Sequence, residues 1–195
     1  MDNKTLFDLH GKTALVTGAS RGIGAATAHL LASYGAHVVV SSRKRESCEE
    51  VVAAIRADGG KASACAAHIG EVASIDALFS QLSSAGRVPD ILVNNAATNP
   101  YFGPMLDMDL TAFDKTVEVN IRGYFYTSVK AARAMRERGG AIVNVASVNG
   151  RRAAPGQGVY SLTKAGAAAL ADRRKVWGRF SRAVDTLLGG RAWPA

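Results

Sequence analysis

A tyrosine and a lysine stand four residues apart in VYSLTKAGAAALADRRK, the stretch that covers residues 159–175. Positions i and i+4 of a helix share one face, so Tyr160 and Lys164 are expected to lie beside each other. An ammonium group next to a phenol favours the phenolate and lowers a tyrosine pKa from its usual value of about 10. A phenol of this kind can give its proton to a carbonyl oxygen, so the pair predicts general acid catalysis.

Ser147 is a third residue whose position suits this chemistry. It closes the apolar run AIVNVAS (141–147) and lies thirteen residues before Tyr160. If the run is a parallel strand, Ser147 lies at the carboxyl edge of the sheet, where open α/β sheets bind ligands. Its hydroxyl could then hydrogen-bond the reacting carbonyl oxygen. Taken singly, a YxxxK pair or a serine after a strand is more often structural, so the prediction depends on the accompanying motifs.

Three glycines lie in the stretch TGASRGIG (17–24), which joins an apolar run to a helical one. Glycine lets the backbone turn sharply and approach a pyrophosphate, whose charge is stabilised by the amides of the following helix. The first strand-to-helix turn of a repeated pattern predicts a dinucleotide site. The spacing is GxxxGxG and not GxGxxG, and a purely structural tight turn is the alternative. The residues expected to contact the cofactor here are Gly18, Ser20, Arg21, Gly22, Ile23 and Gly24.

The end of the second apolar run indicates which nucleotide is bound. NAD-binding proteins usually have an Asp or Glu at this point, which binds the ribose hydroxyls. Here the run ends in VVVSSRK, where Ser42 and Arg43 stand and no carboxylate is present. An arginine and a hydroxyl suit a 2′-phosphate, which requires charge-assisted donors, and Arg21 could reach the same place. NADP is therefore favoured over NAD, with solvated surface charges as the alternative.

These residues need a scaffold, and short β-branched runs alternate with longer helical stretches along the chain. The expected strands are 13–18, 36–42, 61–67, 90–96 and 141–147, of which 61–67 is the weakest prediction. The expected helices are 22–34, 45–58, 73–85, 111–136 and 158–177. Continuous apolar runs predict parallel strands that are buried on both faces. We therefore expect residues 1–195 to form one Rossmann-like domain, a doubly wound α/β/α structure with five to six parallel strands.

Composition and charge argue against several other classes of protein. The 195 residues are 48% apolar and 21% charged, as in an ordinary globular domain. No apolar run approaches the ~20 residues that span a bilayer, and the first residues do not resemble a secretory signal, so a cytoplasmic protein is expected. Half of the net charge of +8 lies in residues 172–195, so no nucleic-acid partner is expected. Cys48 and Cys65 lack metal-ligand spacing, and no metal site is expected.

Together these motifs resemble the short-chain dehydrogenase/reductase family, over about residues 8–170. The family pattern TGxxxGxG matches residues 17–24, and the pattern NNAG matches NNAA at residues 94–97. The local sequences VVVSSRK and NAATNPYFGP are similar to the branch that contains NADPH-dependent carbonyl reductases. The catalytic tetrad of the family falls on Asn120, Ser147, Tyr160 and Lys164. The resemblance implies that Lys164 also binds the nicotinamide ribose and that Asn120 holds a water for proton return.

The resemblance also implies cofactor contacts outside the glycine turn. These fall on His68, Ile69, Asn95, Ala96, Tyr160 and Lys164. His68 stands where the family commonly has an Asp beside the adenine, which we interpret as a variation, because a neutral histidine can also hydrogen-bond adenine. The sequence therefore predicts an NADP(H)-dependent oxidoreductase that acts on a small ketone, aldehyde or secondary alcohol.

The last part of the chain departs from the family pattern. After Ala171 the usual last strand is expected to be missing, and only 182–190 is faintly similar to a sixth strand. A catalytically impaired NADP-binding protein without a complete substrate pocket, and an unstable product without function, are therefore alternative interpretations. Members of this family commonly form dimers and tetramers. We expect a homodimer through the helices 111–136 and 158–177, and no membrane partner.

Overall fold

The computed structural model describes residues 7–171, and within them a single parallel sheet holds five strands in the order β3-β2-β1-β4-β5. The strands are β1 Thr13–Thr17, β2 His37–Ser42, β3 Lys61–Ala66, β4 Ile91–Asn94 and β5 Ala141–Asn144. All five expected strands are therefore confirmed, including the weakest one at 61–67. The order reverses direction at β1, because β2 pairs with one side of it and β4 with the other.

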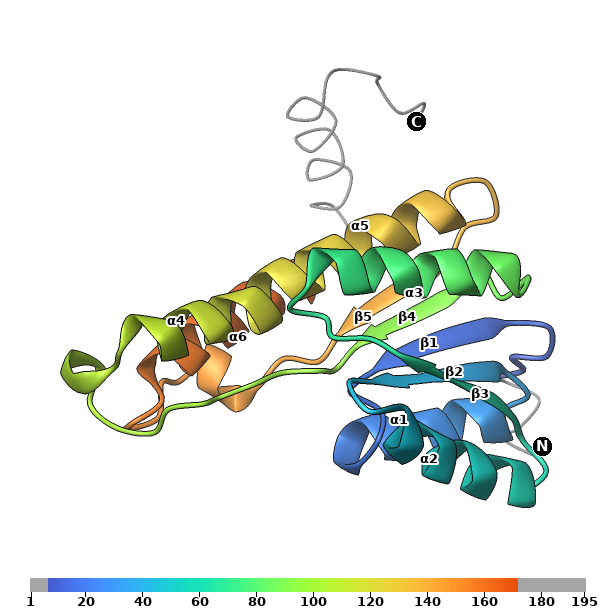
Figure 1. Ribbon diagram of the computed structural model, residues 1–195, viewed down its shortest axis with the longest axis horizontal. Helices are drawn as coiled ribbons and strands as arrows, with labels where there is room; N and C mark the ends of the chain where they lie inside the picture. Colours follow the sequence, from blue (N-terminus) through green and yellow to red (C-terminus); the bar gives the residue numbers. More distant parts are fainter. Residues whose placement is uncertain (1–6, 172–195) are drawn as a thin grey trace.

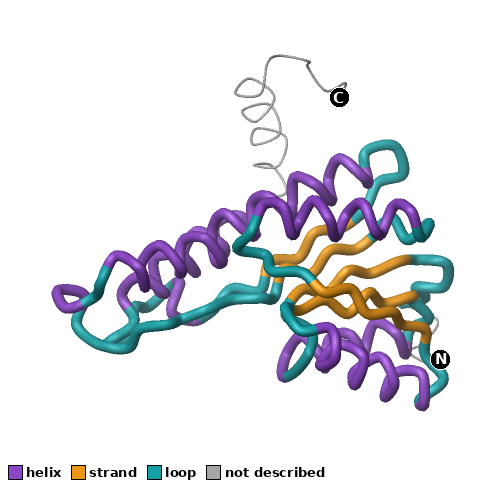
Figure 2. Tube along the Cα trace, viewed as in Figure 1, coloured by secondary structure: helices purple, strands orange, loops and turns teal. Residues whose placement is uncertain are grey.

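Helices cover both faces of the sheet, which makes the three expected layers (Figures 1 and 2). On one face lie α1 Gly22–Ser33 and α2 Arg45–Ala57, and on the other lie α3 Val72–Ser84 and α5 Tyr124–Met135. The last described helix, α6 Gly158–Ala171, lies near the beginning of α5, beyond the carboxyl ends of β4 and β5 (Figure 1). The fold is thus the doubly wound α/β arrangement that the sequence predicts.

The apolar run in β1 explains why the sheet is buried on both sides. Ala14 and Val16 face the core that α1 and α2 complete, whereas Leu15 faces the core below α3 and α5. Successive side chains of a strand point to opposite faces, so a strand between two helical layers must be apolar throughout. All three of these side chains are fully buried.

The expected helix 111–136 differs from the structure in one respect. It begins as α4 Leu110–Val117, continues as the π-helical segment η3 Glu118–Gly123, and resumes as α5. Short π segments that interrupt α-helices are frequently found at functional sites. Two features of this π segment involve other parts of the chain. The Asn120 side chain hydrogen-bonds to the backbone of Thr98. Gly123 packs closely on the segment after β3, because a Cβ there would lie 2.5 Å from the Ile69 carbonyl oxygen. Both depend on partners distant in sequence, so helical periodicity alone could not reveal the interruption.

β5 forms one edge of the sheet within the described residues, where it pairs with β4 alone. Val143 in this strand is half exposed. The expected continuation of α6 to residue 177 and the possible strand at 182–190 lie outside the described residues. No helix in the described part of the chain is long and apolar enough to cross a membrane.

Candidate active site

The glycine turn between β1 and α1 has the backbone conformation that requires glycine. Gly18 and Gly22 have φ values of 63° and 57°, in the left-handed region that other residues rarely adopt. Gly24 is needed for a different reason, because a Cβ there would lie 2.4 Å from the Gly18 carbonyl oxygen. Arg21 is exposed at the N-cap of α1, and its side chain makes no capping hydrogen bond. The turn is therefore tight, and the first amides of α1 lack a side-chain cap.

The segment that follows β4 holds this turn in place. The Asn95 side chain donates hydrogen bonds of 3.0 Å to the carbonyl oxygens of Thr17 and Gly18. The Thr17 hydroxyl accepts from the backbone amides of Asn95 and Ala96, at 3.0 and 3.2 Å. The sequence predicted Asn95 and Ala96 as cofactor contacts, and the structure gives both of them a supporting contact with the glycine turn. This role depends on the pairing of β1 with β4 and has no signature in local sequence.

The end of β2 presents hydroxyl and cationic groups and no carboxylate. The Ser42 hydroxyl lies within hydrogen-bond distance of the Cys48 thiol, with 3.1 Å between Oγ and Sγ. The same hydroxyl donates to the Lys44 carbonyl oxygen at 3.3 Å. Arg43 is exposed, as are the neighbouring Lys44 and Arg45. The Ala19 amide of the glycine turn donates to the Ser41 carbonyl oxygen, so the two predicted nucleotide-binding segments are in direct contact.

His68 and Ile69 lie where the chain leaves β3. Ile69 is buried, and His68 is partly buried, with its Nδ1 accepting a hydrogen bond of 3.1 Å from the Gly70 amide. Its Nε2 lies 3.2 Å from Nζ of Lys115 on α4. The Glu71 carboxylate lies 3.9 Å from Nδ1, so the ring has two donors and one acceptor around it. The pairing with Lys115 was not foreseen, because the two residues are 47 positions apart.

Lys164 lies on α6 with its amino group pointing into the protein. The side chain is 2% exposed, and Nζ lies 5.8 Å from the centroid of the Tyr160 ring. Nζ donates to the Val145 carbonyl oxygen at 2.9 Å and to the Tyr124 hydroxyl at 3.2 Å. Burial lowers the pKa of Lys164 from its usual range to about 8, because removal from water disfavours the charged form. Tyr124 was not among the residues predicted from the sequence.

Asn120 in η3 connects the loop after β4 to α6. Its side-chain oxygen accepts from the Thr98 amide and its nitrogen donates to the Thr98 carbonyl oxygen, both at 2.8 Å. The same nitrogen donates to the Thr163 hydroxyl at 3.2 Å. Thr163 in turn donates to the Tyr160 carbonyl oxygen at 2.8 Å. Asn120 is thus linked through the Thr163 hydroxyl to the backbone of Tyr160, one helical turn before Lys164.

Ser147 follows β5 and begins the short 3-10 helix η4 Val148–Gly150. Its hydroxyl accepts from the Asn149 amide at 3.2 Å, which fixes the turn after the strand. A Cβ on Gly150 would lie 2.5 Å from the Lys164 carbonyl oxygen, so this turn packs directly on α6. All four residues of the predicted tetrad therefore lie at one end of the sheet: Tyr160 and Lys164 are in the first half of α6, and the segments that carry Ser147 and Asn120 contact that half.

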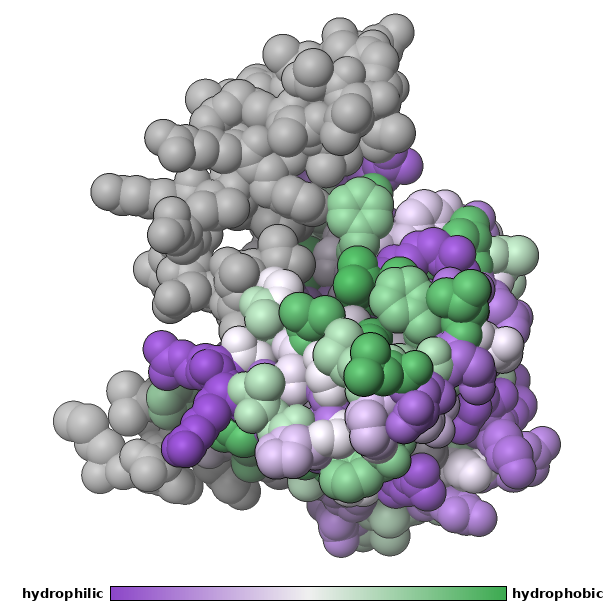
Figure 3. Space-filling model, turned by 90° about the vertical axis from the view of Figure 1, so that its left-hand side faces the viewer, coloured by the Kyte–Doolittle hydropathy of each residue, from purple (hydrophilic) through white to green (hydrophobic). Residues whose placement is uncertain are grey.

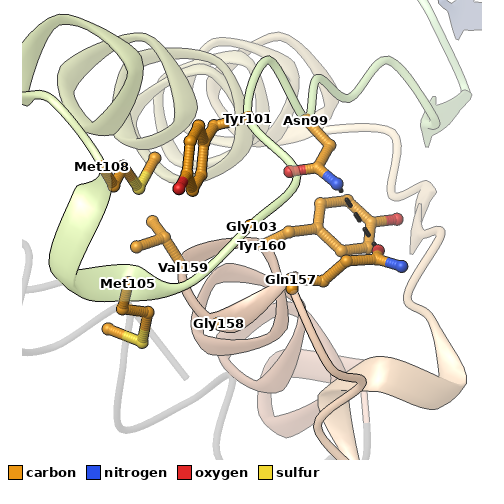
Figure 4. Close-up of a pocket in the computed structure, with 10 residues that line it drawn as sticks. Asn99, Tyr101, Gly103, Met105, Met108, Gln157, Gly158, Val159 and Tyr160 are labelled. Carbon is orange, nitrogen blue, oxygen red and sulfur yellow. Dashed lines mark hydrogen bonds between the residues drawn. The ribbon is translucent and has the colours of Figure 1, made fainter.

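A shallow pocket opens beside Tyr160 (Figure 4). Gln157 accepts hydrogen bonds from the side chains of Asn99 and Asn149, at 3.4 and 3.0 Å. Tyr101 and Val159 lie across the pocket from Asn99 and Gln157. Around the pocket, apolar side chains gather on the end of the molecule where α4 begins (Figure 3). The most exposed of these are Phe102, Met105, Leu106 and Leu110.

The residues present fit a dinucleotide cofactor. The cradle of Gly18 and Gly22 admits close approach to the backbone, and the uncapped amides of α1 can bind a phosphate. Ser20 is half-buried in the turn, and Ile23 is 68% exposed at the start of α1. Within the described residues, no group of three or more His, Cys, Asp or Glu side chains could hold a metal ion. Cys48 and Cys65 are both buried free thiols.

Comparisons with known proteins agree with this arrangement. The family model of short chain dehydrogenases matches residues 12–175. The oxidoreductase YxbG of Bacillus subtilis is 36% identical over 158 residues, which are 81% of this chain and 58% of that protein. Human dehydrogenase/reductase SDR family member 4 is 36% identical over 157 residues, which are 80% of this chain and 56% of that protein.

Solved structures of similar proteins share the fold as well. A metagenomic short-chain oxidoreductase in complex with NADP superposes with a TM-score of 0.81 at 33% identity, over 90% of this chain and 78% of that one. A gluconate 5-dehydrogenase from Burkholderia cenocepacia in complex with NADP and tartrate superposes with a TM-score of 0.80 at 32% identity, over 86% of this chain and 66% of that one. This chain spans less than two thirds of the length of the curated relatives it matches. On the match of its family model and of these relatives, the chain belongs to the short-chain dehydrogenase family.

Proposed function

We propose that the protein is an NADP(H)-dependent oxidoreductase that transfers a hydride between the nicotinamide and a carbonyl compound or secondary alcohol. The observation that carries this proposal is the buried Lys164 beside Tyr160 on α6, at the end of the sheet where the chain also turns through Gly18 and Gly22. Open α/β sheets bind their ligands at this edge. Family membership supports the class of reaction.

Each tetrad residue has a task that its surroundings support. The bound cofactor supplies or takes up the hydride. In carbonyl reduction, the Tyr160 phenol gives its proton to the carbonyl oxygen, and the Ser147 hydroxyl hydrogen-bonds that oxygen and holds it. The Lys164 ammonium stabilises negative charge on the phenol oxygen. Asn120 bonds to Thr98 and Thr163 and so fixes the backbone around the site.

The preference for NADP rests on the charges around the nucleotide end. Arg21 and Arg43 are exposed on the two segments that meet there, and neither the glycine turn nor the end of β2 carries a carboxylate. Guanidinium groups bind phosphates through charge-assisted hydrogen bonds. The two solved relatives described above were crystallised with NADP, which supports the same preference.

The pocket favours a neutral substrate. Its walls combine the amides of Asn99 and Gln157 with the apolar side chains of Met105, Met108 and Val159, and none of its lining residues is charged. Transfer of a charged group into such surroundings would be unfavourable without a paired charge. A ketone, aldehyde or secondary alcohol without a carboxylate is therefore the proposed substrate class.

The proposal is tested by titrating the protein with NADPH and following its fluorescence, and then by a panel of neutral ketones, aldehydes and secondary alcohols. Saturable NADPH binding with oxidation of the cofactor by at least one carbonyl compound is the expected result. Binding without turnover on the whole panel would indicate a nucleotide-binding protein, and absence of binding would contradict the proposal altogether.

Turnover is expected to fall as the pH rises through about 8. The pKa of Lys164 is lowered to about 8, so its ammonium is present below that pH and lost above it. Without the positive charge, the phenolate that forms on Tyr160 is no longer stabilised. The pH profile of kcat/KM checks this, and a profile that stays flat from pH 7 to pH 9.5 would contradict it.

We further propose a homodimer formed through α4, α5 and α6, in line with the expectation for 111–136 and 158–177. Five large apolar side chains are exposed on these helices and on η3. Leu110 and Phe113 lie on α4, Ile121 on η3, Phe125 on α5 and Leu162 on α6. Exposed apolar faces of this kind commonly mark interfaces. Each of these side chains is at least 40% exposed in the single chain.

The variant Leu162→Arg is expected to halve the mass measured by light scattering, because an unpaired charge would be buried in the interface. Leu30→Arg is the matched control, since Leu30 is 57% exposed on α1, on the other side of the sheet. It should leave the mass of the parent unchanged. A stable tetramer, or a parent that is already monomeric, would argue against the proposed interface.

A further inference from the structure

The amino group of Lys164 lies in a triangle of hydrogen bonds with two groups outside the predicted tetrad. Nζ donates to the Val145 carbonyl oxygen at 2.9 Å and to the Tyr124 hydroxyl at 3.2 Å. The Tyr124 hydroxyl itself donates to the Val145 carbonyl oxygen at 3.4 Å. The three groups come from α6, α5 and the end of β5, so the triangle joins the catalytic helix to the sheet.

The Tyr124 hydroxyl can donate to Val145 and accept from Lys164 at the same time only if it is a neutral phenol. The side chain is 3% exposed, and burial, together with the nearby Tyr160, raises the pKa of Tyr124 well above its usual range. A neutral hydroxyl both donates and accepts, so it can give its proton to Val145 while it accepts one from Lys164. The face of its ring adds a second contact, since Nζ lies 5.0 Å from the ring centroid.

The charge of Lys164 has no carboxylate to balance it in the described part of the chain. The groups that face Nζ are the Tyr124 hydroxyl and ring, the Val145 carbonyl oxygen, and the ring of Tyr160. The one acidic residue of the neighbouring η3 is Glu118, and it pairs with Arg122 at 3.3 Å. A buried ammonium that lacks an anionic partner depends on neutral acceptors to remain charged.

We propose that Tyr124 is a positioning residue of the active site, which holds the Lys164 ammonium in place and keeps it charged through its hydroxyl and ring face. An ammonium has three N–H donors, and Tyr124 and Val145 take two of them. One donor is therefore left for the cofactor. Tyr124 acts through Lys164 and touches no substrate, and the inference rests on the proposed function for its catalytic meaning only.

The test begins with the titration of Lys164 itself, which requires neither cofactor nor turnover. The protein is labelled with 13C-lysine, the Cε resonance of Lys164 is assigned by its loss in Lys164→Met, and its shift is followed against pH. In Tyr124→Phe the ring remains and the hydroxyl is lost, so the ammonium loses one acceptor. The pKa of Lys164 is then expected to be about one unit lower than in the parent.

Tyr126→Phe is the matched control. Tyr126 lies two residues further along the chain, and its hydroxyl donates to Asp76 at 2.8 Å and does not contact Lys164. This variant also loses one tyrosine hydroxyl bond, but it should leave the Lys164 titration unchanged. A Tyr124→Phe titration that coincides with that of the parent would overturn the inference. If Tyr124→Phe does not fold, the same titration of Tyr124→Met, which removes hydroxyl and ring together, decides the question.

The pH dependence of NADPH affinity gives a second readout. Binding should weaken at alkaline pH as Lys164 loses its proton. In Tyr124→Phe this weakening should begin at a lower pH, by the same shift as the pKa of Lys164. A double-mutant cycle completes the test: in a Lys164→Met background, the loss of the Tyr124 hydroxyl should have no further effect on binding. Additive losses would mean a purely structural role and would overturn the inference. If no carbonyl compound is reduced by the parent, the proposed function fails, but the titration still reports on Tyr124.

Discussion

Tyr160→Phe is expected to lower turnover by about 10²–10⁴, the usual effect of losing a well-placed general acid, while NADPH binding stays close to that of the parent. The phenol proton is needed when negative charge develops on the substrate oxygen, and the ring alone can only pack. Steady-state kinetics give the first quantity and a fluorescence titration gives the second. Because the Tyr160 side chain is only partly buried, loss of its hydroxyl should leave the free energy of unfolding nearly unchanged.

Two further variants test whether the effect is specific to the Tyr160 hydroxyl and whether it depends on Lys164. Tyr101→Phe is the matched control, since Tyr101 lines the same pocket but its hydroxyl donates to the Pro104 carbonyl oxygen at 2.9 Å. It should retain most of the activity. Lys164→Ala should weaken both turnover and NADPH binding, because the ammonium acts on the phenol and on the cofactor. A Tyr160→Phe protein as active as its parent would leave only a nucleotide-binding fold.

Arg43→Asp is expected to weaken NADPH binding by about 10–100-fold and to improve NADH binding. A hydrogen bond to a charged group is worth about 1.5–3 kcal/mol, and about 1.4 kcal/mol corresponds to a factor of ten. The new carboxylate would also repel a 2′-phosphate, whereas it could accept hydrogen bonds from the free ribose hydroxyls of NADH. Dissociation constants for both cofactors measure the change in preference.

The control for Arg43 stands two residues away. Arg45 is exposed on the first turn of α2 and pairs with Glu49 at 3.2 Å, so Arg45→Asp makes the same change of charge nearby. It should alter cofactor preference much less than Arg43→Asp does. Equal NADPH affinity before and after the Arg43 replacement would refute the assignment of this arginine to the 2′-phosphate.

The sheet could be predicted from the sequence because its strands are apolar on both faces. All of β1 and the four central residues of β2 are buried, and such runs can be recognised without knowledge of their partners. Even β3, with its small residues, was found at 61–67 because it fits the alternation of strands and helices. The positive φ values of Gly18 and Gly22 could be anticipated in the same way, since few residues other than glycine tolerate such a turn.

The features that were missed all depend on partners far away in the chain. Tyr124 contacts Lys164 across 40 positions, and Lys115 reaches His68 across 47. The cofactor contact predicted for Asn95 stays a prediction, whereas its support of the glycine turn 77 positions before it was not foreseen. Local spacing carries no information on such pairs, because they exist only after the sheet has formed. The roles of the tetrad and of the nucleotide-binding residues stay predictions until the variants are measured.

The central position of β1 has a consequence for the order in which the molecule is assembled during synthesis. β1, β2 and β3 pair with their neighbours in sequence and can associate as soon as they leave the ribosome, whereas β1 waits for β4, whose Ile91 pairs with Ala14. Contacts of such long sequence separation form late and slowly. Asn95 can therefore support the glycine turn only after β4 has been made, so a growing chain acquires its nucleotide site later than the pairing of β1, β2 and β3.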